Sequence, residues 1–208
     1  FPYTTLFRSL CPSAACSLLF PMTFLAETQR RRTFAIISHP DAGKTTLSGA
    51  SVTIDRLTLG GNSATLAVAN TGTLTSLINI NHFAGTLAVD GTVTSVGDYS
   101  FFGGLLSGSG RVNAPFLTSV TGQFAPGTLT SVGTLTVGGN LVMSSGTTTF
   151  INLGPNQTAD KLAVTGTANV GGFVSFSPVS GHTVRAGDIY TILTSQGART
   201  GTFKIGRA

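Results

Sequence analysis

The chain has 208 residues, of which 41% are hydrophobic and only 9% are charged, with 27 glycines and no tryptophan. That length allows one domain with a core, and the low charge argues against both a helical bundle and charge-driven disorder. The net charge of +5 would favour an anionic partner, but residues 48–203 carry five acids and five bases. The body therefore has no basic surface of the kind that nucleic-acid binding requires, and we expect no nucleic-acid partner.

The first and last residues carry strings that look like translated DNA adapter. Phe1–Ser9 (FPYTTLFRS) resembles the translation of a common short-read sequencing adapter, and Lys204–Ala208 (KIGRA) resembles that of its reverse complement. We set both aside as scars, the alternative being ordinary frayed termini. Residues 10–21 are then expected to be translated upstream DNA. A secretory signal over Leu10–Phe20 is the alternative, which two prolines and the lack of a basic cluster disfavour.

A possible phosphate-binding segment follows. The apolar run Phe34–Ile37 predicts a β-strand, and Ser38–Thr46 (SHPDAGKTT) follows it directly. This is the strand–loop–helix order of a P-loop, with a serine in place of the first glycine. Backbone N–H groups around Asp41–Lys44 would form an anion nest, and Lys44 would reach the β and γ phosphates. The Thr45 hydroxyl would hold Mg²⁺.

The segment Met22–Leu47 (MTFLAETQRRRTFAIISHPDAGKTTL) resembles the start of bacterial peptide chain release factor 3, a family of translational GTPases. The resemblance implies GTP and Mg²⁺ as cofactors and assigns their binding to Asp41, Gly43, Lys44, Thr45 and Thr46. It stops at Leu47, and no D-x-x-G or N-K-x-D motif follows. Because GTP hydrolysis depends on positioning by a whole domain, we expect no bound cofactor and a poorly ordered basic arm.

Residues 48–203 show a period of two in short runs bounded by glycine, asparagine, aspartate and serine, which predicts β-strands. The tetrapeptide T-L-A-V at Thr65 recurs at Thr86, and T-S-V recurs at Thr94, Thr118 and Thr130. A step of roughly 20–24 residues favours one turn of a parallel β-helix. An antiparallel sandwich with accidental echoes is the alternative.

The order of motifs from Leu106–Val112 (LSGSGRV) through Phe124–Thr130 (FAPGTLT) to Tyr190–Leu193 (YTIL) resembles the passenger repeats of bacterial autotransporters. The resemblance implies export to the cell surface through the outer membrane, and an outer-membrane β-barrel downstream. No apolar run reaches the length of a membrane helix, so we expect no membrane span in this fragment.

Little in the sequence suggests catalysis or metal binding. The histidines are far apart, and we expect His82 and His182 to be loop and turn residues. The body aspartates lie beside glycine or a base, as in Asp160-Lys161, which predicts turns and surface pairs. Cys11 and Cys16 precede the body, and a lone pair is a poor metal site. We therefore expect no enzyme, no catalytic residue and no metal site.

Together these observations predict a chimeric reading frame with an all-β fold: a fragment of a right-handed parallel β-helix, or solenoid, preceded by a poorly ordered N-terminal arm. The expected parts are 1–21 (non-native), 22–47 (truncated P-loop), 48–203 (solenoid) and 204–208 (adapter remnant). The expected function is a non-catalytic surface stalk, with adhesion to an unknown surface partner as a further role; the N-terminal segment would be cytoplasmic in its parent. The alternatives are a GTP-binding translational GTPase and a natural fusion of both modules.

Overall fold

The computed structural model describes residues 34–37 and 44–205, with side chains from Lys44 onward. By its contacts the chain divides into Phe1–Arg31 and Arg32–Ala208, and the description below concerns the second unit. Residues 1–33 and 38–43, most of the expected N-terminal arm, and the adapter-like residues 206–208 lie outside the described residues.

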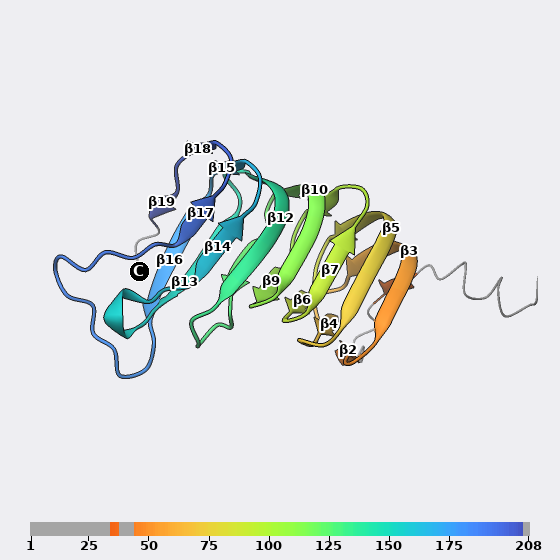
Figure 1. Ribbon diagram of the computed structural model, residues 1–208, viewed down its shortest axis with the longest axis horizontal. Coiled ribbons are helices and arrows are strands. Elements are labelled where there is room, and N and C mark those ends of the chain that lie inside the picture. Colours follow the sequence, from red (N-terminus) through yellow and green to blue (C-terminus); the bar gives the residue numbers. More distant parts are fainter. Residues whose placement is uncertain (1–33, 38–43, 206–208) are drawn as a thin grey trace, which may run out of the picture. The chain divides into compact units, whose positions relative to one another are not determined.

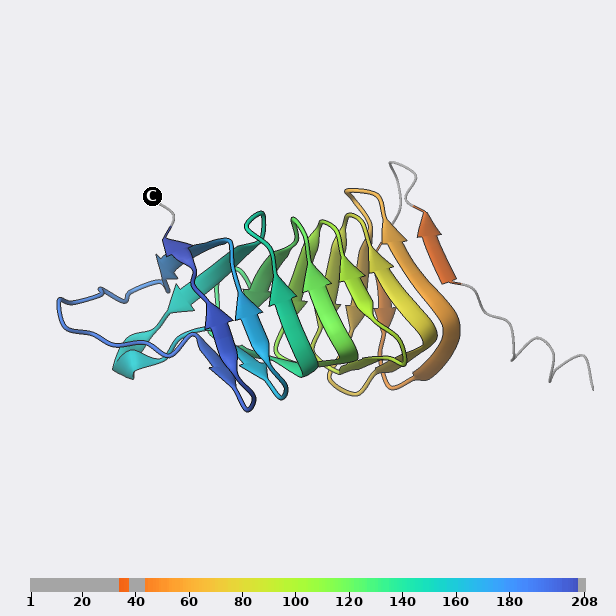
Figure 2. The ribbon, with the colours of Figure 1, turned by 90° about the horizontal axis from the view of Figure 1, so that it is seen from above.

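The described residues form two parallel β-sheets that face each other across one core (Figures 1 and 2). Sheet A contains β1 (Phe34–Ile37), β3 (Ser51–Gly60), β5 (Thr73–His82), β7 (Thr92–Ser95), β8 (Tyr99–Phe101), β10 (Arg111–Ser119), β12 (Thr134–Met143), β14 (Lys161–Val164), β15 (Ala168–Val170), β17 (Leu193–Ser195) and β18 (Arg199–Gly201). Sheet B contains β2 (Lys44–Leu47), β4 (Thr65–Val68), β6 (Thr86–Val89), β9 (Leu105–Gly108), β11 (Gln123–Pro126), β13 (Thr148–Leu153), β16 (Phe173–Pro178) and β19 (Lys204–Ile205).

Each turn of the chain passes through sheet A, bends at a corner, and returns through sheet B, which builds a β-solenoid of about six turns. Within sheet A the strand bends in its middle. There the pairing register shifts, as between Ile54 and Arg56, or the strand divides, as between β7 and β8. The predicted all-β solenoid fold is therefore confirmed. Within residues 34–37 and 44–205, no helix is long and apolar enough to cross a bilayer.

The T-L-A-V repeat is a true repeat of the solenoid. Thr65–Val68 and Thr86–Val89 lie side by side in register, residue for residue. The T-S-V repetition is accidental, because its copies occupy different positions within one turn of the solenoid. Thr94 pairs with Asn113 before the corner of sheet A, whereas Thr118 pairs with Ser100 after it.

The core consists of inward-facing side chains that stack from turn to turn. One column contains Leu57, Ile80, Tyr99, Leu117 and Leu141, which are all fully buried and in register. Each such burial contributes about 1.5–3 kcal/mol of transfer free energy. The alternating buried and half-buried positions of β4, β6 and β12 follow from the period of two in the sequence.

Glycine is required where the chain turns tightly against the previous turn. Gly172 has a φ of +80°, and a Cβ atom there would collide with the backbone carbonyl of Thr147. Gly139 has a φ of +145°, and its added Cβ would collide with the carbonyl of Ala114. Both residues combine a left-handed conformation with close backbone approach, which only glycine allows.

The pairing extends beyond both limits expected from the sequence. β1 and β2 precede Ser48 and pair in parallel with β3 and β4. At the other end β19, which includes the adapter-like Lys204, pairs with β16. Parallel strand pairing is therefore present on both sides of each sequence boundary.

The connections that lead from sheet B back to sheet A lengthen along the solenoid. Two residues join β6 to β7 and β9 to β10, whereas residues 127–133, 154–160 and 179–192 form the last three connections. Figure 1 shows the last two projecting together, with the short 3-10 turn η1 (Pro155–Gln157) in the earlier of them. The corners from sheet A to sheet B stay short throughout.

Candidate functional site

The P-loop-like residues lie at the start of the solenoid. Asp41 and Gly43 are outside the described residues, whereas Lys44, Thr45 and Thr46 belong to β2 and pair with β4. Lys44 and Thr46 are exposed, and Thr45 points toward an apolar cavity of about 90 Å³. Because side chains alternate along a strand, Lys44 and Thr45 point to opposite faces. This strand differs from the loop-to-helix geometry that the resemblance implies for phosphate binding.

His82 is a core residue, so its prediction as a loop residue is wrong. It ends β5 and is completely buried between Leu59 and Phe101 of the neighbouring turns. Its Nδ1 lies 2.9 Å from the Tyr99 hydroxyl and its Nε2 lies 3.2 Å from the Gly85 carbonyl oxygen. Because that carbonyl can only accept, Nε2 carries the proton and Nδ1 accepts from Tyr99. Burial lowers the pKa of His82 to about 4, against smaller opposing effects of hydrogen bonds to Gly85 and Ala84.

Asp160 is also buried, so its prediction as part of a surface pair with Lys161 is wrong. Its two carboxylate oxygens accept hydrogen bonds from the backbone N–H groups of Gly133, at 2.7 Å, and Asn152, at 2.8 Å. Burial raises the pKa of the Asp160 carboxyl, while these hydrogen bonds act in the opposite direction. The carboxylate therefore joins one connection to the strand of the next turn and has a structural role.

A cluster of titratable side chains forms on the connection 179–192. His182 follows a turn in which its N–H donates to the Val179 carbonyl, as its predicted turn position requires. Its Nε2 lies 3.0 Å from the Tyr190 hydroxyl, which donates to Asp188 Oδ2 at 3.3 Å. The same oxygen accepts the backbone N–H of Arg185 at 2.8 Å. Since the hydroxyl proton points to Asp188, the Tyr190 oxygen accepts from His182. The hydrogen bonds therefore run in one direction, from His182 through Tyr190 to Asp188, and we call this series the relay.

The relay lines a polar surface pocket of about 420 Å³ between the two projecting connections. One wall is η1, where Asn156 and Gln157 have φ of +57° and +60° although neither is glycine. The other wall is formed by residues 181–190. Desolvation, followed by the nearby Asp188 carboxylate, raises the pKa of Tyr190, which keeps the proton that the hydroxyl donates to Asp188.

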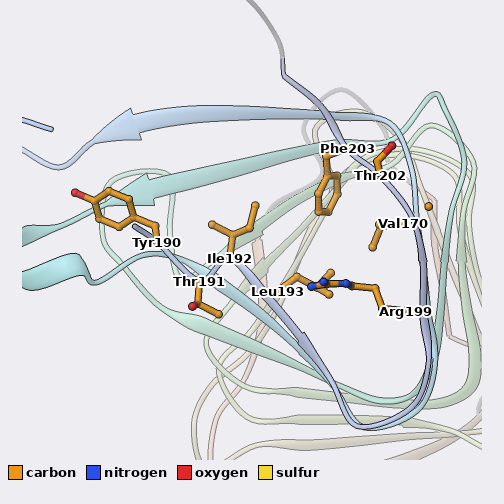
Figure 3. A pocket seen from close by; sticks show the side chains of 9 residues that line it. Val170, Tyr190, Thr191, Ile192, Leu193, Arg199, Thr202 and Phe203 are labelled. Atoms are coloured by element: carbon orange, nitrogen blue, oxygen red, sulfur yellow. The ribbon is translucent and has the colours of Figure 1, made fainter. Parts of the chain in front are cut away.

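A second cavity, of about 390 Å³, lies at the open end of the solenoid core (Figure 3). Val170, Leu193 and Phe203 line it, and the Arg199 side chain extends toward Leu193 within the turn that the backbone forms. Arg199 pairs with Ala168 and so continues the inward-facing column that contains Leu141. The Tyr190 hydroxyl points away from this cavity (Figure 3). The cavity is thus the unfilled end of the core.

The polar pocket was not predicted from the sequence. Asn156-Gln157-Thr158 fits the N-glycosylation pattern and Tyr190 opens the motif Tyr190–Leu193, but neither pattern predicts a pocket. The spacing of Asp188 and Tyr190 is the one local signal, because it places two polar groups on the same side of an extended segment. In the part of the chain that the structure describes, no three histidine, cysteine, aspartate or glutamate side chains meet as a metal-binding group.

Comparison with known proteins gives short N-terminal similarities. The chain is 82% identical over 27 residues to peptide chain release factor 3 of Bordetella avium, which is 13% of this chain and 5% of that protein. It is 52% identical over 48 residues to peptide chain release factor 3 of Aromatoleum aromaticum, 23% of this chain and 8% of that protein. The chain thus spans less than a tenth of the length of either relative.

No family model matches the chain, and no solved structure matches it. The short similarities to release factor 3 and the β-solenoid that follows are what a chimera of two unrelated segments would contain.

Proposed function

We propose that the solenoid is a structural segment of an exported surface protein, of the autotransporter passenger type. The observation that carries the proposal is the stacking of one apolar core over about six turns, enclosed by faces that carry few charges. A repeat built in this way extends by adding turns and holds whatever its loops carry away from an anchor. Residues 17–208 contain no cysteine, so the solenoid segment would also cross an oxidising compartment without forming stray disulfides of its own.

The experiment is surface display of the whole chain between a secretory signal and an outer-membrane β-barrel in a bacterial host. We expect external protease to release a resistant fragment that contains the solenoid. A Leu117→Asp variant places a charge in the core and should be degraded, which controls for folding. A wild-type chain that stays inside the cell, or is fully degraded at the surface, would contradict the proposal.

The second candidate is nucleotide binding, which the release factor 3 similarity favours. GTP and Mg²⁺ would then be held by Asp41, Gly43, Lys44, Thr45 and Thr46. We propose that they are not held, because Lys44 and Thr45 lie in a strand and point to opposite faces. Calorimetric titration with GTP and Mg²⁺ tests this: binding that Lys44→Ala abolishes would support the nucleotide-binding function instead.

We also propose that the chain is a chimera bounded by adapter remnants. Amplification across codons 47 and 48 from source DNA should give no product. A clean product of the expected length would support a natural fusion, and both terminal strings inside a longer genomic frame would contradict an adapter origin.

A further inference from the structure

We propose that the polar pocket between η1 and the connection 179–192 binds a neutral oligosaccharide. The inference adds a ligand to the stalk role proposed above, but it rests on the geometry of the two connections alone. It holds whether or not the solenoid is an exported passenger.

The first argument is the charge of the pocket. Its lining includes one arginine, Arg185, and one acidic residue, Asp188, whose charges cancel. A site for phosphate or sulfate would need a surplus of cationic groups. A site for a metal ion would need further carboxylate or imidazole ligands, which the described residues do not bring together. The pocket therefore suits a ligand with no net charge.

The second argument is the kind of hydrogen bond that the pocket offers. The Asn156 and Gln157 amides each present a donor and an acceptor, and Thr183 presents a hydroxyl. The two amide side chains are exposed. Groups that both donate and accept are matched by hydroxyls, and adjacent hydroxyls can satisfy one planar amide at two points. A ligand rich in neighbouring hydroxyl groups is a sugar.

The third argument is preorganisation. Asn156 and Gln157 are both held in the left-handed region, which costs of order 1–3 kcal/mol for a residue other than glycine, and strain of this kind is concentrated at ligand sites. On the opposite wall the relay from His182 through Tyr190 to Asp188 fixes the ring of Tyr190. The Tyr190 and Pro155 rings then offer apolar surface to the C–H groups of a sugar. The pocket is open on one side, which suits a unit of a chain.

The test uses the purified full chain and a panel of neutral hexasaccharides: maltohexaose, cellohexaose, laminarihexaose, xylohexaose and chitohexaose. Heparin hexasaccharide serves as the anionic arm. Binding is measured by calorimetry, after circular dichroism has shown that each variant retains the β spectrum. Asn156→Gly and Gln157→Gly remove the amides and also relieve the left-handed strain, so these variants should fold at least as well as the wild type. Gln196→Gly, in an exposed bend outside the pocket, is the matched control.

We expect at least one neutral hexasaccharide to bind, and each pocket variant to weaken it about tenfold, the loss of one well-made hydrogen bond. Gln196→Gly should leave the affinity unchanged. Binding of no neutral sugar, binding of the heparin fragment alone, or equal affinity in the pocket variants would each overturn the proposal.

Discussion

His82 shows how a polar side chain can occupy the interior of this solenoid. Tyr99, in the next turn, donates to its Nδ1, and Gly85 accepts from its Nε2, so the neutral ring has no unmade hydrogen bond. Phe101 stacks on it at a centroid distance of 4.6 Å. The neutral form is satisfied, whereas a protonated ring would place a charge in the core and a second donor against the Tyr99 hydroxyl.

This environment makes the stability of the protein depend on pH. The pKa of His82 is lowered from 6.5 to about 4, so the unfolded chain binds the proton more readily than the folded one. Its contribution to stability is present above pH 6.5 and is lost as the pH falls toward 4. The loss should reach about 3 kcal/mol. Urea unfolding at pH 7 and pH 4.5 measures it.

A His82→Gln variant is the comparison for this prediction. It keeps an acceptor for Tyr99 and a donor for Gly85 but cannot titrate, so its pH dependence should be flatter than that of the wild type. An equally steep profile in the variant would show that another group is responsible.

At the scale of elements, hydrogen bonds hold the three long connections to the turns beside them. The Asn152 side chain donates to the Thr128 carbonyl at 2.8 Å, and the Asp160 carboxylate accepts from Gly133 and Asn152. The Val179 N–H donates to the Leu153 carbonyl at 2.9 Å. The connection 154–160 is thus held by the connection 127–133, whereas the connection 179–192, which forms one wall of the pocket, is held by the end of β13.

Replacing Asp160 by asparagine should loosen this series of contacts. The asparagine side chain keeps one acceptor oxygen, but its NH₂ group would face a backbone N–H, so two donors would oppose each other. The substitution should therefore lower the free energy of unfolding by about 1–3 kcal/mol. Asp98→Asn, at an exposed corner, is the control and should change stability by less than about 0.5 kcal/mol. Chemical denaturation of both variants at pH 7 measures the difference, and equal midpoints would show that the carboxylate is not needed.

At the scale of the whole solenoid, the sequence predicted the strands and their repeats but not the contacts that side chains make with neighbouring turns. The period of two and the in-register T-L-A-V copies specify strands and their stacking, because both depend on residues close in sequence. His82 and Asp160 were misplaced because their partners, Tyr99 and Gly133, lie about one turn away along the chain. The polar pocket was missed for the same reason, since its walls come from two successive connections.

Arg199 has a consequence for the association of the protein. It extends the inward column of Ala168 at the last described turn, and its exposed charge lies at the open end of the core. Inward-pointing charge discourages another sheet from pairing with an exposed edge. We expect Arg199→Leu to increase self-association, seen as a concentration-dependent rise in sedimentation coefficient. Arg185→Leu removes the same charge from an exposed loop and should sediment like the wild type; matching behaviour of the two variants would contradict the role of position.

The lengthening of the connections from sheet B to sheet A separates two kinds of evolutionary change. The stacked interior constrains the strands and the short corners, so substitutions there must preserve size and alternation. The seam formed by residues 127–133, 154–160 and 179–192 accommodates loops of different length without altering the register of the turns beside it. Insertions at this seam can therefore change the groups that the loops present while the scaffold is inherited unchanged, so loop chemistry and folding can diversify independently.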